Sequence, residues 1–188
     1  MRETVDYGPL SVLIGTWQGD KGIDIAPKPE EDENNPYYET LTFEPVDIDI
    51  ENAEQQQLAA IRYHQLVREK SNDKVSHDET GYWIFNKDDN TILLTFSIPR
   101  GVNVLAVGEF IESFDDPKDI VFSVSAKLNN SDSGIIQSSF MFKNAKTTAF
   151  SRELRISGDK LSYTQETIVD IYDKKSFSHT DENILKRM

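Results

Sequence analysis

The chain contains no cysteine among its 188 residues. Disulfide bonds, iron–sulfur clusters and thiolate zinc sites are therefore excluded. Histidine is also scarce, and the nitrogen ligands available to a metal are His64, His77 and His179. The lack of cysteine fits a reducing compartment, and we expect a cytoplasmic protein.

Long apolar segments are lacking as well. The first residues include acids and no apolar run, so we expect no signal peptide. No stretch approaches the roughly 18 consecutive apolar residues of a membrane-spanning helix. Basic residues are outnumbered by acidic ones, 20 against 33, and the net charge is −13. Because such a surface repels phosphates and anionic lipids, we expect no nucleic-acid or membrane partner.

Familiar catalytic motifs are absent too. The sequence has no Gly-x-Ser-x-Gly elbow, no His-Glu-x-x-His pair and no phosphate-binding loop. Asp78 and Glu79 are adjacent, so on a strand they point to opposite faces and cannot act as a glycosidase pair. These absences favour a binding protein over an enzyme.

What dominates the chain instead is the alternation of apolar and polar residues from Thr16 onward. A period of two is typical of half-buried antiparallel strands. Turn-forming segments at residues 87–90, 129–134 and 157–159 separate the runs. We therefore expect an all-β fold of about ten strands in a single domain over residues 1–188. Alternating apolar residues include Leu41, Phe43, Ile61, Tyr63, Ile92, Leu94, Phe96, Phe122, Val124, Leu154, Ile156, Leu161 and Tyr163.

An up-and-down β-barrel is favoured over a β-sandwich. Residues 164–167 (Thr-Gln-Glu-Thr) are polar on both faces, which a cavity holding a ligand and water tolerates better than a packed sandwich core. Closure would also remove exposed strand edges. We expect a short helical turn at residues 9–14 to plug one barrel end. We expect residues 28–36, which are acidic and flanked by proline, to form an exposed, mobile loop.

Spacing alone does not assign a role to any histidine. His64 lies on the polar face of its strand with Arg62, which favours a surface position. His77 shares a face with Gly81, and a glycine there indicates close approach by either a ligand or a neighbouring side chain. His179, near the end of the chain, is by position an ordinary surface residue.

Several stretches together resemble the nitrobindin-like haem-binding β-barrels, relatives in fold of fatty-acid-binding proteins and lipocalins. Residues 13–19 (LIGTWQG) resemble the family's Leu-x-Gly-Thr-Trp-x-Gly, and residues 77–83 (HDETGYW) its His-x-Glu-x-Gly-Tyr strand. Residues 151–154 and 158–163 are similar to its penultimate hairpin, and residues 179–187 to its histidine-led C-terminus. The match keeps motif order over nearly the whole chain and is closest to a bacterial branch.

The resemblance implies a b-type haem whose iron is bound by His179, with His77 near the haem. Asp181 or a backbone carbonyl would then accept a hydrogen bond from the ligating imidazole. The stretch from residue 19 to 27 would line the pocket, with Ala26 where the family has tyrosine. Further pocket residues implied are Thr16, Trp17, Gly22, Pro27, Pro99 and Arg62, with Lys21 and Arg100 as other partners for the propionates.

The same resemblance implies nitric oxide binding and conversion of peroxynitrite to nitrate on ferric haem. One alternative is a metal-free carrier of a fatty acid or another small apolar ligand. Another is a barrel whose role is contact with proteins, and a homodimer is compatible with each of these hypotheses.

Overall fold

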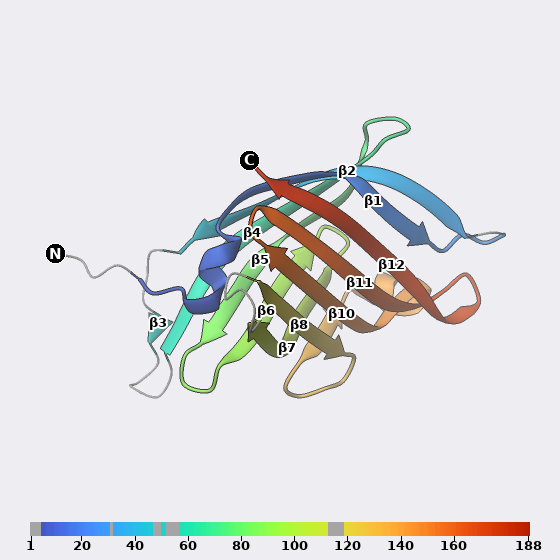
Figure 1. The fold of residues 1–188 in the computed structure, drawn as a ribbon. Coiled ribbons are helices and arrows are strands. Elements are labelled where there is room, and N and C mark those ends of the chain that lie inside the picture. Colours follow the sequence, from blue (N-terminus) through green and yellow to red (C-terminus); the bar gives the residue numbers. More distant parts are fainter. Residues whose placement is uncertain (1–4, 31, 47–49, 52–56, 113–118) are drawn as a thin grey trace.

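The computed structural model describes residues 5–30, 32–46, 50–51, 57–112 and 119–188. Within them the chain forms twelve strands, one 3-10 helix and one short α-helix (Figure 1). In order these are η1 (Gly8–Leu13), β1 (Gly15–Ala26), β2 (Glu33–Pro45), β3 (Ile50–Glu51), β4 (Gln57–Glu69), β5 (Val75–Asn86), β6 (Thr91–Ile98), β7 (Val102–Glu112), β8 (Ile120–Lys127), β9 (Gly134–Gln137), α1 (Ser139–Asn144), β10 (Ala145–Ser157), β11 (Lys160–Ile171) and β12 (Lys174–Arg187).

Ten of these strands close into an antiparallel barrel. The order β2-β1-β12-β11-β10-β8-β7-β6-β5-β4 is completed by pairing of β2 with β4. Two short strands lie outside this ring, since β3 pairs with β4 and β9 with β7. The predicted up-and-down barrel of about ten strands is therefore confirmed. Closure pairs the first strand with the last and leaves no edge within the ring.

The predicted alternation sets which side chains face inward. On β4, Tyr63 and Gln65 are buried whereas Arg62 and His64 are exposed. Large side chains fill the half of the barrel that packs against η1. Its core includes Trp17, Phe43, Tyr63, Trp83, Phe122, Leu154 and Leu185.

The 3-10 helix η1 closes that packed end, as the sequence predicts. Leu10 and Leu13 are fully buried against the core. The indole Nε1 of Trp17 donates a hydrogen bond of 2.8 Å to the Leu13 carbonyl, which ties the helix to β1. The helix therefore acts as a plug, and the space for a ligand must lie at the other end.

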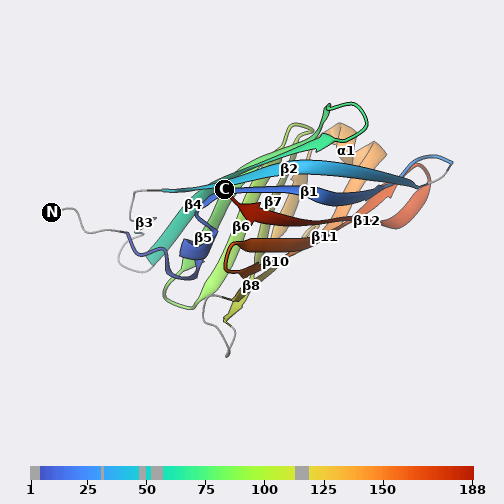
Figure 2. The ribbon, with the colours of Figure 1, turned by 45° about the horizontal axis from the view of Figure 1, so that its top comes forward.

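The opposite end of the barrel is formed by the β1–β2, β4–β5, β6–β7 and β11–β12 connections. The short helix α1 lies at this end as well (Figure 2). The sequence analysis did not predict α1, because six residues are too few for helical periodicity to be visible. Its sequence signal is Ser138, whose Oγ accepts a hydrogen bond from the Met141 amide as an N-cap.

The expectation of a loop over residues 28–36 is wrong for its second half. Strand β2 begins at Glu33, and residues 33–36 pair with β1, with Ile25 opposite Asn34 and Asp24 opposite Asn35. The acidic composition suggested a solvated loop, but backbone pairing in a long hairpin does not require apolar side chains. The connection is reduced to residues 27–32, and Asn35 is placed beside the cavity end of the barrel.

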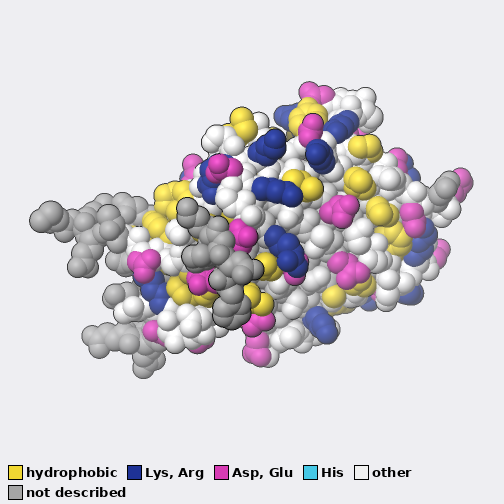
Figure 3. Space-filling view, viewed as in Figure 1, with side chains coloured by type: hydrophobic (Ala, Val, Ile, Leu, Met, Phe, Trp, Pro, Cys, Tyr) yellow, Lys and Arg dark blue, Asp and Glu magenta, His cyan; other side chains and the backbone are white. Residues whose placement is uncertain are grey.

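The outer surface carries both signs of charge. Figure 3 shows acidic and basic side chains interspersed over one face, among polar residues and scattered apolar ones. In the described part of the chain, no helix is long and apolar enough to cross a membrane.

We predict that Leu13→Ala lowers the free energy of unfolding by about 2 to 5 kcal/mol, because it opens a cavity beneath the plug. Urea denaturation measures the change. The matched control is Leu105→Ala, which truncates a leucine that is 38% exposed on β7 and should cost about 0.5 kcal/mol. Equal losses at the two positions would show that η1 does not stabilise the packed end.

Candidate functional site

A cavity of about 350 Å³ occupies the end of the barrel opposite η1. Its volume lies in the range of small-molecule sites, roughly 300 to 1,000 Å³. Nearly all the barrel strands contribute to its wall, and Met141 of α1 lies over it. A wider and more open hollow lies on the outer face of the barrel, over β1, β7, β8, β10, β11 and β12, and serine, threonine and glutamate make up half of its lining.

One side of the cavity is apolar. Branched and aromatic side chains from the inward faces of β4, β6, β7, β10 and β11 form it, as the period of two dictates. Such a wall offers burial to a flat hydrophobic ligand, worth roughly 25 cal/mol for each Å² removed from water. Its members are Val67, Phe96, Ile98, Val102, Val104, Phe150, Val169 and Ile171.

The other side carries His179 with two aspartates. The Nε2 atom of His179 lies 2.6 Å from Asp24 Oδ1 and 3.9 Å from Asp181 Oδ2. The imidazole is 32% exposed. Burial opposes its charged form, but the hydrogen bond to Asp24 and the charge of Asp181 raise the pKa of His179 above its ordinary value. The resemblance implies Asp181 or a backbone carbonyl as acceptor for the non-ligating ring nitrogen; in the structure Nε2 contacts Asp24, and Asp181 lies 3.9 Å from the same atom.

The two aspartates are themselves held by amides. Asn35 Nδ2 donates to Asp24 Oδ2 at 3.3 Å, and Gln165 Nε2 donates to Asp181 Oδ2 at 3.2 Å. Burial and the neighbouring charge of Asp24 raise the pKa of Asp181 to about 6, although His179 opposes the shift.

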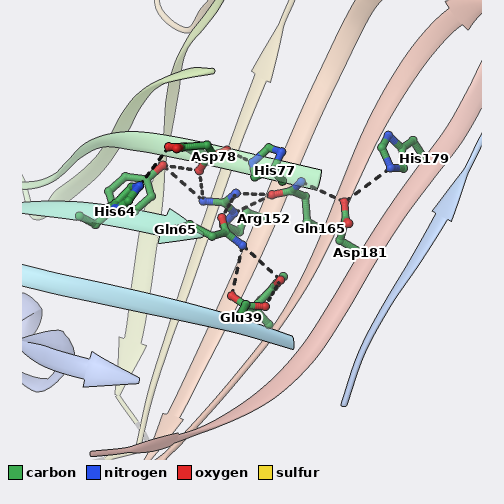
Figure 4. A network of polar contacts seen from close by, with 12 residues as sticks. Glu39, His64, Gln65, His77, Asp78, Arg152, Gln165, His179 and Asp181 are labelled. Carbon is green, nitrogen blue, oxygen red and sulfur yellow. Dashed lines mark hydrogen bonds and ion pairs between the residues drawn. The ribbon is translucent and has the colours of Figure 1, made fainter. Parts of the chain in front are cut away.

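A buried ion pair lies at the inner side of the cavity, and Figure 4 shows its arginine, Arg152, linked to Gln65 and Gln165. Arg152 Nη1 lies 2.9 Å from Glu79 Oε1, and both side chains are almost completely buried. Arg152 Nε also donates to Gln165 Oε1 at 2.8 Å. Burial alone would raise the pKa of Glu79, yet the charge of Arg152 and the hydrogen bond with His77 lower it to about 2. Glu79 is therefore ionised at neutral pH.

His77 joins this network from β5. Its Nε2 lies 3.2 Å from Glu79 Oε2, and the side chain lines the cavity. Burial disfavours the charged ring, but the hydrogen bond and charge of Glu79 outweigh it and raise the pKa of His77. Two imidazoles thus face one cavity, His77 near its inner limit and His179 beside the aspartates.

A second polar group lies deeper, around Glu39. Its carboxylate accepts hydrogen bonds from Tyr163 Oη at 2.7 Å and Asn183 Nδ2 at 2.8 Å. Gln65 Nε2 donates to the same carboxylate at 3.3 Å and bridges it to Arg152. Burial raises the pKa of Glu39 against these hydrogen bonds. In the described residues, every buried side-chain nitrogen and oxygen has a partner.

Only part of the haem-pocket set named from the sequence lines the cavity. His179, His77 and Pro27 do so. Pro99 lies in the exposed β6–β7 turn, next to Arg100, which lines the cavity.

The others lie elsewhere. Trp17 belongs to the packed core and Thr16 to the start of β1, near η1. Gly22 lies beneath the ring of Tyr37, which occupies the space of a side chain there. Arg62 points outward, because it alternates with Tyr63, and pairs with Glu44 at 2.6 Å.

The structure shows what approaches Gly81, the glycine that shares a strand face with His77. A Cβ atom there would overlap the carbonyl oxygen of Thr95 on β6. The glycine therefore admits the backbone of a neighbouring strand, where the sequence left a ligand or a neighbouring side chain open.

Four residues were missed from the sequence: Arg152, the buried partner of Glu79, and then Glu79, Gln165 and Asp24, which line the cavity. The first three had a signal, since each shares a strand face with buried residues: Arg152 lies between Phe150 and Leu154, for example. Asp24 had none, because its position depends on the pairing of β1 with β12.

We predict that Glu79→Gln destabilises the protein by about 3 to 5 kcal/mol, because it leaves Arg152 buried without its counter-charge. Chemical denaturation measures the loss. Glu44→Gln is the matched control, since it breaks the exposed pair with Arg62 and should cost less than about 1 kcal/mol. Similar values for both variants would contradict an essential buried pair.

Comparisons with known proteins agree with this architecture. Among solved structures, twelve chains match significantly. One, a crystal structure of Rv2717c from M. tuberculosis, is 23% identical, with a TM-score of 0.73 over 97% of this chain and 99% of that one. That similarity supports the fold alone. No curated protein sequence matches the chain significantly. A family model described as the THAP4-like, heme-binding beta-barrel domain matches residues 6–187, so the chain belongs to this nitrobindin-like family.

Proposed function

We propose that this barrel binds a haem in the 350 Å³ cavity, with His179 supplying an axial nitrogen to the iron. The observation that carries the proposal is the position of His179. Its imidazole faces a cavity whose opposite wall is apolar, and the family to which the chain belongs is described as heme-binding. An axial imidazole and an apolar surface are the two requirements that a b-type haem places on a protein.

The residues present fit this group with one rearrangement. The Nε2 atom of His179 now contacts Asp24 at 2.6 Å, so it must leave that carboxylate before it can bind iron. Turning the ring would let Nδ1 donate to Asp24, an arrangement that fixes the tautomer of metal-bound histidines. With no cysteine in the chain, thioether attachment is excluded and the haem would be held without covalent bonds to its ring. Arg100 is the cationic partner available to a propionate.

When bound, the haem would supply an iron position able to take nitric oxide. If the protein is also an enzyme, the reaction we propose is the isomerisation of peroxynitrite to nitrate. His77 is the second imidazole lining the cavity within the described residues. Its elevated pKa favours the protonated ring, which donates hydrogen bonds from both nitrogens. It is therefore suited to orient a small polar ligand.

A fatty acid is a weaker candidate for this cavity. A carboxylate ligand needs an unpaired cation or hydrogen-bond donor inside the barrel. Arg152 is already paired with Glu79 and Gln165, and the lining also carries Asp24 and Asp181. These charges disfavour an anionic head group beside Arg152 and the aspartates, so a fatty acid would have to present its carboxylate to Arg100.

We predict that the apoprotein develops a Soret band on titration with hemin, and that His179→Ala weakens binding at least about tenfold. Difference absorbance spectroscopy measures the affinity. His64→Ala is the matched control, because His64 lies outside the barrel beside Asp78 and should leave the titration unchanged. Identical weak spectra from wild type and His179→Ala would overturn the assignment.

Nitric oxide provides the second readout on the haem-loaded protein. It should shift the Soret band of the loaded protein, and nitrate yield from peroxynitrite measures the isomerase activity. A loaded protein that responds to neither would limit the function to binding of haem.

A further inference from the structure

We propose that Asp24, His179 and Asp181 form a binding site for one divalent transition-metal ion of the Zn²⁺ type in the haem-free protein. The site is distinct from the proposed haem site in its ligand set, although the two share His179. Neither proposal depends on the other.

The donor set matches known chemistry of such ions. One ligand atom from each residue lies within 4.8 Å of the other two. Zn²⁺ binds imidazole nitrogen and carboxylate oxygen at about 2.0 to 2.2 Å, and three protein ligands leave the fourth tetrahedral position open to water or substrate. The cavity beside these residues provides room for that fourth ligand.

The required movements are small. Tetrahedral ligands at those bond lengths are about 3.4 Å apart. The His179 nitrogen is now 2.6 Å from the Asp24 oxygen and 3.9 Å from the Asp181 oxygen. The first separation must therefore open, and the second close, by less than about 1 Å, and the two carboxylate oxygens start within 4.8 Å of each other.

Backbone register places the three residues on one face. Asp24 on β1 is the direct partner of Asp181 on β12, and His179 lies two residues before Asp181 on the same strand. Residues two apart on a strand share a face, so all three side chains point into the cavity. The site is thus built on paired strands and not on a mobile loop.

Charge gives an independent reason to expect a cation. Two carboxylates that lie directly opposite each other on paired strands destabilise a sheet. Asp24 and Asp181 are only 23% and 21% exposed, and in the described part of the chain neither forms an ion pair with lysine or arginine. A histidine must be neutral to bind a metal, and with His179 neutral the two ionised aspartates give the group two negative charges. A divalent ion would neutralise them.

Amides orient both carboxylates from outside the group. Asn35 donates to Asp24, and Gln165 donates to Asp181. Gln165 is held in turn by Arg152. Loss of such a hydrogen bond to a ligating carboxylate lowers metal affinity by about 10-fold to 100-fold.

The experiment titrates CoCl₂ and ZnCl₂ separately into haem-free full-length protein. Cobalt bound by nitrogen and oxygen ligands should give visible d–d absorption, and calorimetry should give one Zn²⁺ per chain. Asp24→Asn and Asp181→Asn should each weaken binding at least about tenfold. Asp78→Asn is the matched control, because Asp78 contacts His64 at 3.0 Å without a second carboxylate in the group.

Circular dichroism checks that each variant keeps its strands. No cobalt spectrum with wild type, or equal affinities for wild type, Asp24→Asn and Asp181→Asn, would overturn the proposal. Hemin titration of Asp24→Asn separates the two proposals: a Soret band that survives while the cobalt spectrum disappears assigns Asp24 to the divalent ion alone. If folded Asp24→Asn lost both the Soret band and the cobalt spectrum, the proposal of a divalent-ion site distinct from the haem site would be overturned.

Discussion

The buried ion pair between Arg152 and Glu79 divides the interior of this barrel. Arg152 and Glu79 lie where the core packed around Trp83 and Leu154 gives way to the cavity. An unpaired guanidinium at that depth would cost several kcal/mol, so both charges must be present together. Phe96 and Phe150 lie near Arg152, with ring centroids 5.5 and 5.4 Å from its guanidinium carbon. The pair therefore sets the depth of the cavity.

The same pair connects the two histidines that face the cavity. Glu79 contacts His77, while Arg152 holds Gln165, which donates to Asp181 beside His179. Networks of this kind restrict each member to one orientation when every polar atom is satisfied. The side chains that face the cavity are thus positioned by the interaction that stabilises the fold. A change at Arg152 would reach both imidazoles without touching either of them.

Alternation in the sequence predicts most of the barrel but little of the site. A period of two correctly assigns Tyr63 to the interior and Arg62 to the surface, because burial of one sheet face is a local property of each strand. The same period places Arg152 between Phe150 and Leu154, and so puts a charged residue on a buried strand face. Its partner Glu79, 73 residues away, follows from the closed topology and not from any local pattern.

Contacts between the first and last strands, β1 and β12, are the hardest to predict from the sequence. Asp24 and His179 are 155 residues apart, and they meet because β1 pairs with β12 in one register. An irregularity between Gln18 and Ile23 shifts that register by one residue, and a single sequence does not show where such a shift occurs. Local composition even misled at residues 33–36, whose polar side chains belong to β2.

The position of Asp24 determines which metal His179 could bind. Its carboxylate is in contact with the nitrogen that either iron or a divalent ion would use. In the first case the ring must turn so that Nδ1 donates to Asp24, which would increase the basicity of the ligand. In the second Asp24 stays and becomes a ligand itself. Since one nitrogen cannot bind two metals, a divalent ion in the group would exclude haem, and the fraction of protein able to take haem would depend on the supply of that ion.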